Sequence, residues 1–298
     1  MINVHILGIT TTTGYYLKNK FNNKNKKYKF TGYSRKIKKY KPIDFRYSKI
    51  SNLNLSTNNF LVSCGPIWEF SQFILNSYNY EKELFKKINS IIVCSSSSVI
   101  TKRFAYNDFD KSLASKLKKS EDALLELCDK LKIKCYILRP TMIYGCGGNY
   151  QDKNIKVILK IMKFLPFIFI PKRTGLRQPI HAKQFSNYIY YLLEKCYEKE
   201  EINQENEIIN LGGDEELTYK KMLIRLRNSF PKNDQINSCK LIEIPSSIFF
   251  ILITPLMLFS PKIYEAFLRL NSNLSGFSKV SALLKRKFET FPIKPFIK

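Results

Sequence analysis

The stretch INVHILGITTTTG, residues 2 to 14, decides the fold of this 298-residue chain. It opens with a short apolar run that ends at Gly8, which is typical of a buried β-strand closed by a turn. A run of threonines follows, and Gly14 then leads into YYLKNKF, which continues as a helix. The stretch therefore predicts a strand, a glycine turn and a helix.

The sequence up to about residue 150 repeats this alternation. Strands are expected at 27–35, 58–65, 89–99 and 134–141, and helices at 69–87 and 111–132. Later helices are expected at 154–165, from about residue 183 and over LTYKKMLIRLRNSF, with a strand at 207–213. Strands that alternate with helices imply βαβ units and a parallel sheet. The predicted fold class is α/β: a Rossmann-type doubly wound parallel sheet with a smaller C-terminal α/β substrate lobe. The expected domains are residues 1–150 and 151–298, the second being interleaved with the last sheet strands.

The glycine turn has the position of a dinucleotide-binding turn. In such a turn one glycine permits the tight bend, another lets the backbone approach the pyrophosphate, and a third allows the helix to pack closely on the strand. The phosphates then lie on free amides of the helix N-terminus. The expected cofactor contacts are Gly8, Thr11, Thr12, Thr13 and Gly14. Thr11 replaces the middle glycine, so its hydroxyl could bond a phosphate or its bulk could block close approach. The alternative is two purely structural glycines beside an empty pocket.

The second strand ends in Tyr33-Ser34-Arg35 and lacks the acidic residue that binds the ribose 2′-hydroxyl of NAD. Ser34 offers a hydroxyl and Arg35 a planar cation, a pair that suits a 2′-phosphate. The predicted cofactor is therefore NADP(H) in preference to NAD(H). The alternative is that Arg35 simply faces solvent.

Composition narrows the function classes. The net charge of +26 could indicate a nucleic-acid or anionic-membrane surface, but lysines are spread over the whole chain. Because basic and aromatic residues are not interleaved as in nucleic-acid modules, no specific nucleic-acid partner is expected. Seven cysteines without a CxxC pair indicate buried thiols in a reducing compartment, and two histidines make a metal site improbable.

The segment IFFILITPLMLF, residues 249–260, is the most apolar in the chain. It is too short to span a bilayer, so it predicts a helix of the core or lobe. The alternative is a patch that lies on a membrane surface. The N-terminus shows no signal-peptide pattern, so a cytoplasmic location is expected.

Several strand ends carry recognisable motifs. They are Gly8 to Gly14, Cys64-Gly65-Pro66, Ser95-Ser96-Ser97-Ser98-Val99, Leu138-Arg139-Pro140-Thr141-x-x-Tyr144-Gly145 and Arg177-Gln178-Pro179-Ile180-His181. With these motifs the chain resembles, over about residues 2 to 215, the extended short-chain dehydrogenase/reductase family. Within that family it is similar to the NAD-dependent epimerase/dehydratase group, which acts on nucleotide-diphosphate sugars.

The resemblance implies roles for individual residues. Ser96 would hold the substrate hydroxyl or carbonyl. Further cofactor contacts would be Cys64, Gly65, Pro66, Ser95 and Pro140, and the substrate contacts would be Ser97, Thr141, Asn154 and Arg177. A guanidinium such as that of Arg177 suits a diphosphate.

The family's Tyr-x-x-x-Lys pair is missing from the helix after residue 111. Glu121 fixes the register by resemblance and places Leu113 and Leu117 at the two positions, and a shift of one residue either way supplies no tyrosine. In the family the phenol moves a proton as hydride transfers, and the lysine lowers its pKa. The substitutes considered are Tyr106, a lysine within 116–119, or water.

Two functions follow from these observations. One is an NAD(P)-dependent epimerase or ketoreductase that acts on a nucleotide-diphosphate sugar. The other is a non-catalytic protein that binds the dinucleotide in a structural or sensing role. A homodimer and a peripheral membrane contact through 249–260 are further options.

Overall fold

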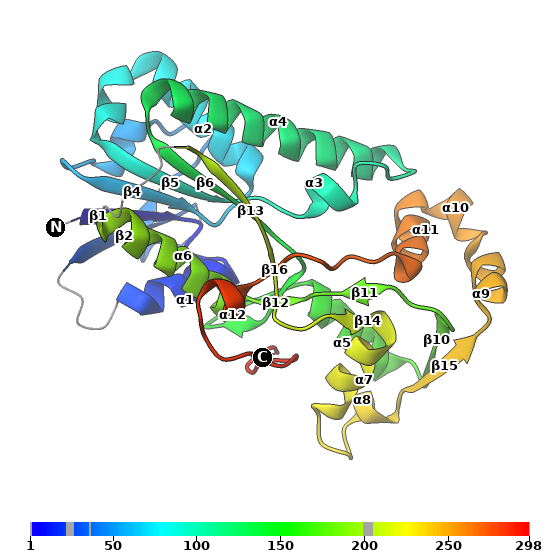
Figure 1. Ribbon diagram of the computed structural model, residues 1–298. Helices are drawn as coiled ribbons and strands as arrows, with labels where there is room; N and C mark the ends of the chain where they lie inside the picture. Colours follow the sequence, from blue (N-terminus) through cyan, green and yellow to red (C-terminus); the bar gives the residue numbers. More distant parts are fainter. Residues whose placement is uncertain (1, 22–26, 36, 199–204, 298) are drawn as a thin grey trace.

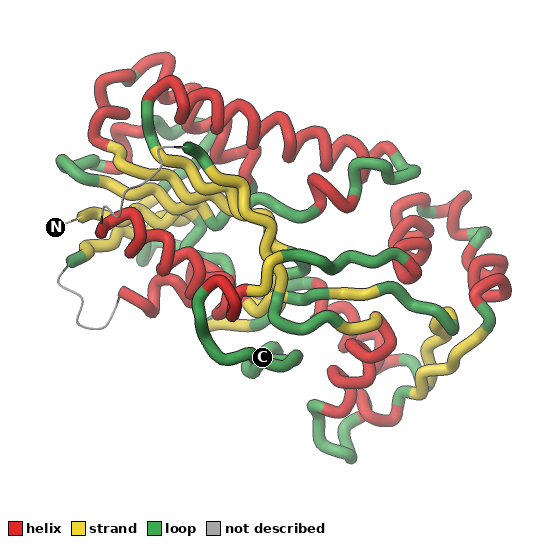
Figure 2. The backbone as a smooth tube through the Cα atoms, in the orientation of Figure 1, coloured by secondary structure: helices red, strands yellow, loops and turns green. Residues whose placement is uncertain are grey.

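An eight-stranded parallel sheet forms the centre of the structure (Figure 1 and Figure 2). The computed structural model describes residues 2–21, 27–35, 37–198 and 205–297. In spatial order the strands are β3 (Lys41–Pro42), β2 (Tyr28–Ser34), β1 (Ile2–Leu7), β4 (Asn59–Ser63), β5 (Ile88–Cys94), β6 (Lys134–Pro140), β13 (Glu207–Gly212) and β16 (Ser278–Lys279). All neighbouring strands pair in parallel. The predicted Rossmann-type α/β fold is confirmed.

Helices cover both faces of this sheet (Figure 1). One face packs against α2 (Ile67–Tyr80) and α4 (Asp108–Leu131), and the other against α1 (Thr12–Phe21), α6 (Ala182–Glu198) and α12 (Val280–Leu283). Strands buried on both faces need apolar residues at successive positions. In β5, Ile91 and Val93 join the core under α2 and α4, whereas Ile92 joins the core under α1 and α6.

Three elements differ from the sequence prediction. Helix α4 begins earlier than expected, because the Asn107 side chain accepts the amide hydrogen of Asp110 at 2.9 Å and caps the helix. Strand β5 ends at Cys94, and the serines after it leave the sheet and lead into α3 (Ser98–Thr101). The expected helix at 69–87 is divided into α2 and the 3₁₀ helix η2 (Lys82–Lys87).

A second body of structure follows residue 150. Helices α5 (Asn154–Phe164), α7 (Tyr219–Asn228) and α8 (Gln235–Ser238) share one core. Short strands flank it as the pairs β10 (Phe167–Pro171) with β15 (Lys240–Ile244), and β11 (Leu176–Arg177) with β14 (Leu217–Thr218). Strands β7 (Ile143–Tyr144) and β12 (Ile180–His181) join it to the end of β6. The hairpin of β8 (Cys146–Gly147) and β9 (Tyr150–Gln151) lies against α1.

The apolar segment 249–260 lies in two short helices, and a third helix follows them directly. These are α9 (Ser246–Ile253) and α10 (Leu256–Phe259), and α11 (Pro261–Leu268) follows. Pro255 lies between the first two, where its missing amide donor limits continuation of the helix. Phe249 and Ile253 anchor α9 in a small core of its own with Leu270. Within the described residues, no helix combines the length and apolarity that a bilayer crossing requires.

Candidate functional site

The carboxyl ends of the sheet strands bring the predicted site residues to one edge. Gly8 follows β1, Ser34 ends β2, Cys64 follows β4, Ser95 follows β5 and Pro140 ends β6. The strand register aligns these ends in one row. The strand order reverses between β1 and β4, which is where open parallel sheets bind their ligands.

The two outer glycines of the turn are required by its geometry. Gly8 has a φ of +81°, and a Cβ on it would lie 2.9 Å from the backbone nitrogen of Gly65. A Cβ on Gly14 would lie 2.5 Å from the carbonyl oxygen of Gly8. The first glycine thus permits the bend and the second lets α1 pack on it.

Thr11 is engaged within the turn itself. Its hydroxyl donates to the Gly8 carbonyl at 2.9 Å and accepts the Gly14 amide hydrogen at 3.0 Å. Thr11 therefore caps α1, and its hydroxyl hydrogen is used inside the turn. In the described part of the chain, the amides of Thr12 and Thr13 have no acceptor and remain available to an anion.

Ser34 and Arg35 lie beside this turn. The Ser34 hydroxyl oxygen accepts the amide hydrogen of Ile37 at 3.2 Å, which leaves its position fixed at the end of β2. The Arg35 guanidinium lies 3.7 Å from a Glu69 carboxylate oxygen, and about half of the Arg35 side chain is exposed. A pair this long and this exposed is weak, so a phosphate could replace Glu69 as the partner of Arg35.

A cleft of about 490 Å³ opens between the sheet edge and the second body. Five predicted substrate or catalytic residues line it, namely Ser96, Ser97, Thr141, Asn154 and Arg177, together with the predicted cofactor contacts Ser95 and Pro140. The lining also includes residues that received no role from the sequence, namely Ser98 and Gln178 of the quoted motifs, and Thr101, Lys102, Met142, Ile143, Arg269 and Leu274. Hydroxyls and cations dominate the polar lining, which suits an anionic, hydroxyl-rich ligand.

A buried ion pair supports the turn at residues 95–98, which follows β5 and which we call the serine turn. Ser95 donates its hydroxyl hydrogen to Glu121, and Arg139 donates to the same carboxylate through Nε at 3.0 Å and 3.1 Å and through Nη2. Glu121 is fully buried. The pair joins α4 to β6 and fixes Ser95, whereas the Ser96 hydroxyl accepts the amide hydrogen of Ser98 at 3.1 Å.

Arg177 lies in the cleft wall with its guanidinium committed to backbone carbonyls. It donates to Leu176 at 2.8 Å, to Ser272 at 2.7 Å and to Arg269 at 2.5 Å. Its guanidinium also lies over the Tyr219 ring, 5.4 Å from the centroid. Arg177 thus ties the segment at 269–272 to β11. Its charge faces the cleft, but most of its donors are already used.

His181 is a buried structural histidine next to this wall. Its Nδ1 accepts the Lys183 amide hydrogen at 3.1 Å, so the ring hydrogen lies on Nε2, which contacts the Pro295 carbonyl at 3.1 Å. Burial lowers the pKa of His181 to about 4. The imidazole is therefore neutral near pH 7 and does not serve as a proton donor to the cleft.

The positions of the missing catalytic pair face the protein core. Leu117 lies on the buried side of α4, and Leu113, also on α4, packs against the same core. Tyr106 is 69% exposed and is not part of the cleft lining. Its backbone amide donates to Glu265 at 3.1 Å, which holds the loop against α11. Along the described residues, neither a tyrosine nor a carboxylate lines the cleft.

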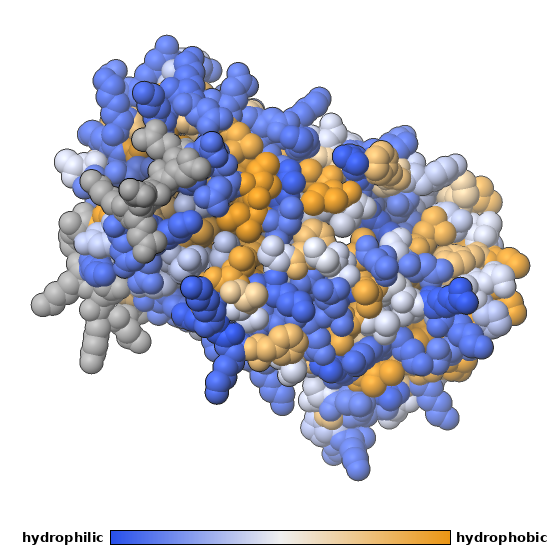
Figure 3. All heavy atoms as spheres, viewed as in Figure 1, coloured by the Kyte–Doolittle hydropathy of each residue, from blue (hydrophilic) through white to orange (hydrophobic). Residues whose placement is uncertain are grey.

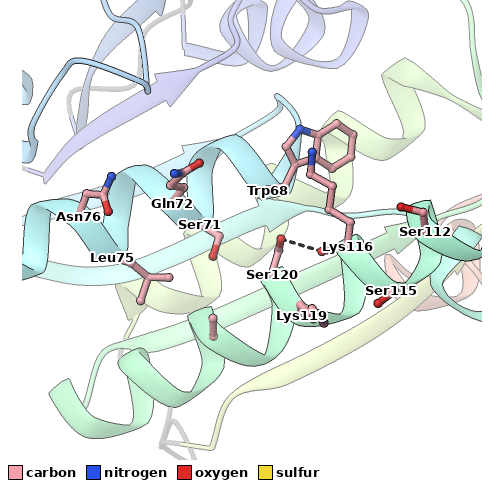
Figure 4. Close-up of a pocket in the computed structure, with 11 residues that line it drawn as sticks. Trp68, Ser71, Gln72, Leu75, Asn76, Ser112, Ser115, Lys116, Lys119 and Ser120 are labelled. Atoms are coloured by element: carbon pink, nitrogen blue, oxygen red, sulfur yellow. Dashed lines mark hydrogen bonds between the residues drawn. The ribbon is translucent and has the colours of Figure 1, made fainter. Parts of the chain in front are cut away.

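Two lysines of α4, Lys116 and Lys119, line a second hollow on the outside of the sheet domain (Figure 4). This groove of about 550 Å³ lies between α2 and α4, and Ser112, Ser115, Lys116 and Lys119 line it. Lys116 lies over Trp68 from α2, 4.7 Å from the ring centroid. The shifted register Ser112 with Lys116 therefore points away from the cleft, and Lys118 pairs with Asp122 at the surface.

Several solved structures that share this fold are nucleotide-sugar enzymes. A UDP-glucuronic acid 4-epimerase from Bacillus cereus, in complex with UDP-glucuronic acid and NAD, superposes with a TM-score of 0.63 at 15% identity and covers 97% of this chain and 94% of its own. A UDP-N-acetylglucosamine 4-epimerase from Bacillus cereus gives 0.59 at 16% identity, with 92% and 98% covered. A nucleoside-diphosphate-sugar epimerase from Staphylococcus aureus gives 0.60 at 11% identity, with 97% of each chain covered.

These likenesses extend over nearly the whole chain. No family model matches the sequence, and no curated protein matches it significantly. At such identities the likeness is one of fold. The resemblance to extended short-chain dehydrogenases/reductases implied by the strand-end motifs is confirmed at that level.

Proposed function

We propose that this protein binds NADP(H) and acts as an epimerase or ketoreductase on a nucleotide-diphosphate sugar. The observation that carries the proposal is the alignment of the Gly8–Gly14 turn and the serine turn along one carboxyl edge, next to a cleft rich in hydroxyls and cations. The dinucleotide would supply and accept hydride. The residues of the chain would position both ligands.

The turn between β1 and α1 fits the pyrophosphate of a dinucleotide. The close approaches of Gly8 and Gly14 leave no room for side chains, and the first-turn amides of Thr12 and Thr13 point to the N-terminal end of α1. The helix dipole adds a favourable potential for an anion there. Gly65 is the neighbour across the turn, and a Cβ on it would find no closer atom than Phe45 Cε2 at 4.0 Å.

The cleft fits the sugar end of the substrate. Ser96, Ser97 and Asn154 are partly or fully exposed there and can bond sugar hydroxyls. Arg177 and Arg269 add positive potential for the diphosphate. In a hydride transfer, Ser96 would orient the reacting oxygen. The proton would come from water or from Tyr106 after a movement of its loop.

One observation favours the second candidate, a non-catalytic dinucleotide-binding protein. Among the residues that the structure describes, the cleft wall offers no phenol or carboxylate for proton transfer. Loss of a positioned acid or base costs about 10²- to 10⁴-fold in rate. A dinucleotide-binding role without turnover needs no such group, which is why this observation favours the second candidate.

Two ligand measurements test the proposal. Calorimetric titration with NADP(H) should show binding, and Gly65→Ala should weaken it about tenfold or more, because the new methyl enters the ligand side of the turn. The same variant should keep the thermal stability of the wild type, since the nearest protein atom to its methyl, Phe45 Cε2, lies at 4.0 Å, which is an ordinary van der Waals distance. Absence of binding by either coenzyme would refute the assigned pocket.

The coenzyme preference has its own test. Arg35→Ala should reduce the affinity for NADP(H) about tenfold or more and leave that for NAD(H) unchanged, because only the 2′-phosphate contacts this guanidinium. Equal loss for both coenzymes, or tighter NAD(H) binding by the wild type, would contradict the preference.

Turnover separates the two candidates. Oxidation of NADPH is followed with a panel of keto-sugar nucleotides, for the wild type and for Tyr106→Phe. Turnover lost in Tyr106→Phe would assign the proton to that phenol, and unchanged turnover would exclude it. Tight coenzyme binding without turnover on any substrate would support the non-catalytic candidate.

A further inference from the structure

An exposed apolar surface lies at the end of the molecule opposite the N-terminal strands, on α9, α10 and α11 (Figure 1). Its members, which we call the apolar end face, are Ile248, Ile251, Leu252, Leu258, Phe259 and Ile263. Leu258 is 86% exposed and Phe259 is 84% exposed. Figure 3 shows part of this surface as orange atoms around these helices. Apolar side chains gathered in this way mark an interaction surface.

Helix α9 is apolar on both of its sides. Phe249 and Ile253 are buried in the small core with Leu270, whereas Ile248, Ile251 and Leu252 face outward at helical spacing. A helix of a soluble domain normally presents polar residues on its outer face. The outer stripe of α9 is therefore not explained by packing within this chain.

The charges around the apolar end face are positive. From Ile244 to Tyr264 the only charged residue of the sequence is Lys262. Its ammonium lies 4.2 Å from the centroid of the exposed Phe109 ring, and Arg103 lies 4.5 Å from the centroid of the exposed Phe104 ring. Phe104 lies in the loop before α4, and Phe109 lies in the first turn of α4. The backbone of Tyr106, between them, contacts α11 through Glu265.

The nearby carboxylates are mostly neutralised by partners. Glu265 lies 3.7 Å from Arg269, Asp110 lies 2.6 Å from Lys102, and Glu243 pairs with Lys220. Asp108, at the first turn of α4, is the acid that stays exposed in this region. The apolar end face thus combines apolar tips with two nearby cations beside aromatic rings, Lys262 and Arg103, and one exposed acid, Asp108. Apolar tips flanked by cations and aromatic rings suit the headgroup level of a membrane.

We propose that the apolar end face is a peripheral docking surface for an anionic phospholipid bilayer. The net charge of +26 favours an anionic surface and opposes close approach by a second copy of this chain. Helices of 8 and 4 residues cannot cross a hydrocarbon core about 30 Å thick, so Leu258 and Phe259 insert only to the level of the headgroups. This inference is independent of the proposed function.

Vesicle sedimentation with the full chain tests the docking surface. The wild type should sediment with vesicles of phosphatidylcholine containing about 30% phosphatidylserine, and much less with phosphatidylcholine alone. Leu258→Ser/Phe259→Ser should weaken binding by about 100-fold, since burial of each side chain is worth about tenfold or more. Lys262→Gln should weaken it about fivefold and reduce its dependence on salt.

The matched control is Tyr47→Ser/Tyr80→Ser. These tyrosines are 81% and 75% exposed and lie on the sheet domain, so their removal should leave vesicle binding unchanged. Equal binding by the Leu258→Ser/Phe259→Ser variant and the wild type would overturn the proposal, as would failure of the wild type to bind anionic vesicles. A concentration-dependent dimer that this variant abolishes, without vesicle binding, would assign the face to a second copy and also overturn it.

Discussion

Neutralising Glu121 should reveal how strongly the buried ion pair holds the cleft together. Glu121 is fully buried, and Arg139 meets its carboxylate through two nitrogens while Ser95 donates a further hydrogen bond. Glu121→Gln keeps the size of the side chain but leaves the Arg139 charge buried without a counter-charge. Breaking a buried pair in this way costs about 3–5 kcal/mol of unfolding free energy. At about 2–4 °C per kcal/mol for a chain of this size class, Tm should fall by roughly 6–20 °C.

The assay is thermal unfolding followed by circular dichroism, with Asp122→Asn as the matched control. Asp122 is the next residue on α4, its side chain is 52% exposed, and it pairs with Lys118 at the surface. Its neutralisation should change the unfolding free energy by about 0.5 kcal/mol or less. Replacing both partners, as in Glu121→Leu/Arg139→Met, should recover much of the loss because no charge remains buried. A Tm for Glu121→Gln equal to that of Asp122→Asn would refute the reasoning.

Three further outcomes are expected from other parts of the structure. Because burial lowers the pKa of His181 to about 4 from its usual 6.5, its contribution to stability is complete above pH 6.5 and is lost as the pH falls toward 4, by up to about 3 kcal/mol. Urea unfolding of His181→Asn should show a shallower loss over that pH range than the wild type, and equal slopes would contradict this. Gly14→Ala should lower Tm by roughly 2–12 °C, since its Cβ would lie 2.5 Å from the Gly8 carbonyl oxygen; an unchanged melting curve would show that α1 can shift freely. Arg177→Lys should lose the fork that binds three carbonyls and expose the 269–272 segment to limited proteolysis, whereas a wild-type cleavage pattern would argue against that tie.

The sheet was predictable from sequence because each central strand is a local apolar run. Parallel strands buried on both faces have continuous apolar sequences, such as IIVC in β5, and Gly14 is required by atoms of Gly8 and Ile9, which are close in sequence. The strand ends then follow from topology, which is why the serine turn and Thr141 could be expected at one edge. Boundaries were less certain because the Asn107 cap acts on α4 from outside the apolar pattern.

The cleft wall was harder to predict because its residues are distant in sequence. Arg269 lies beyond the part of the chain that carries recognisable motifs, and tertiary contacts hold it at the cleft: Arg177 binds its carbonyl, and its own guanidinium donates to the Thr101 carbonyl. In the sequence, Glu121 could be used to align the helix after residue 111 with the family, but its pairing with Arg139 depends on tertiary packing. The outward position of Tyr106 also depends on such packing, since Glu265 from α11 holds its backbone.

The late arrival of β13 at the sheet has a consequence for synthesis of the chain. β6 pairs along one side with β13, whose residues 207–212 emerge from the ribosome well after residues 134–140. Until then the backbone groups along one edge of β6 have no strand partner, and the sheet face that α6 later covers remains exposed to solvent. Nascent chains that stall near residue 150 should therefore need a chaperone to avoid edge-to-edge association, because the partner strand of β6 has not yet been made.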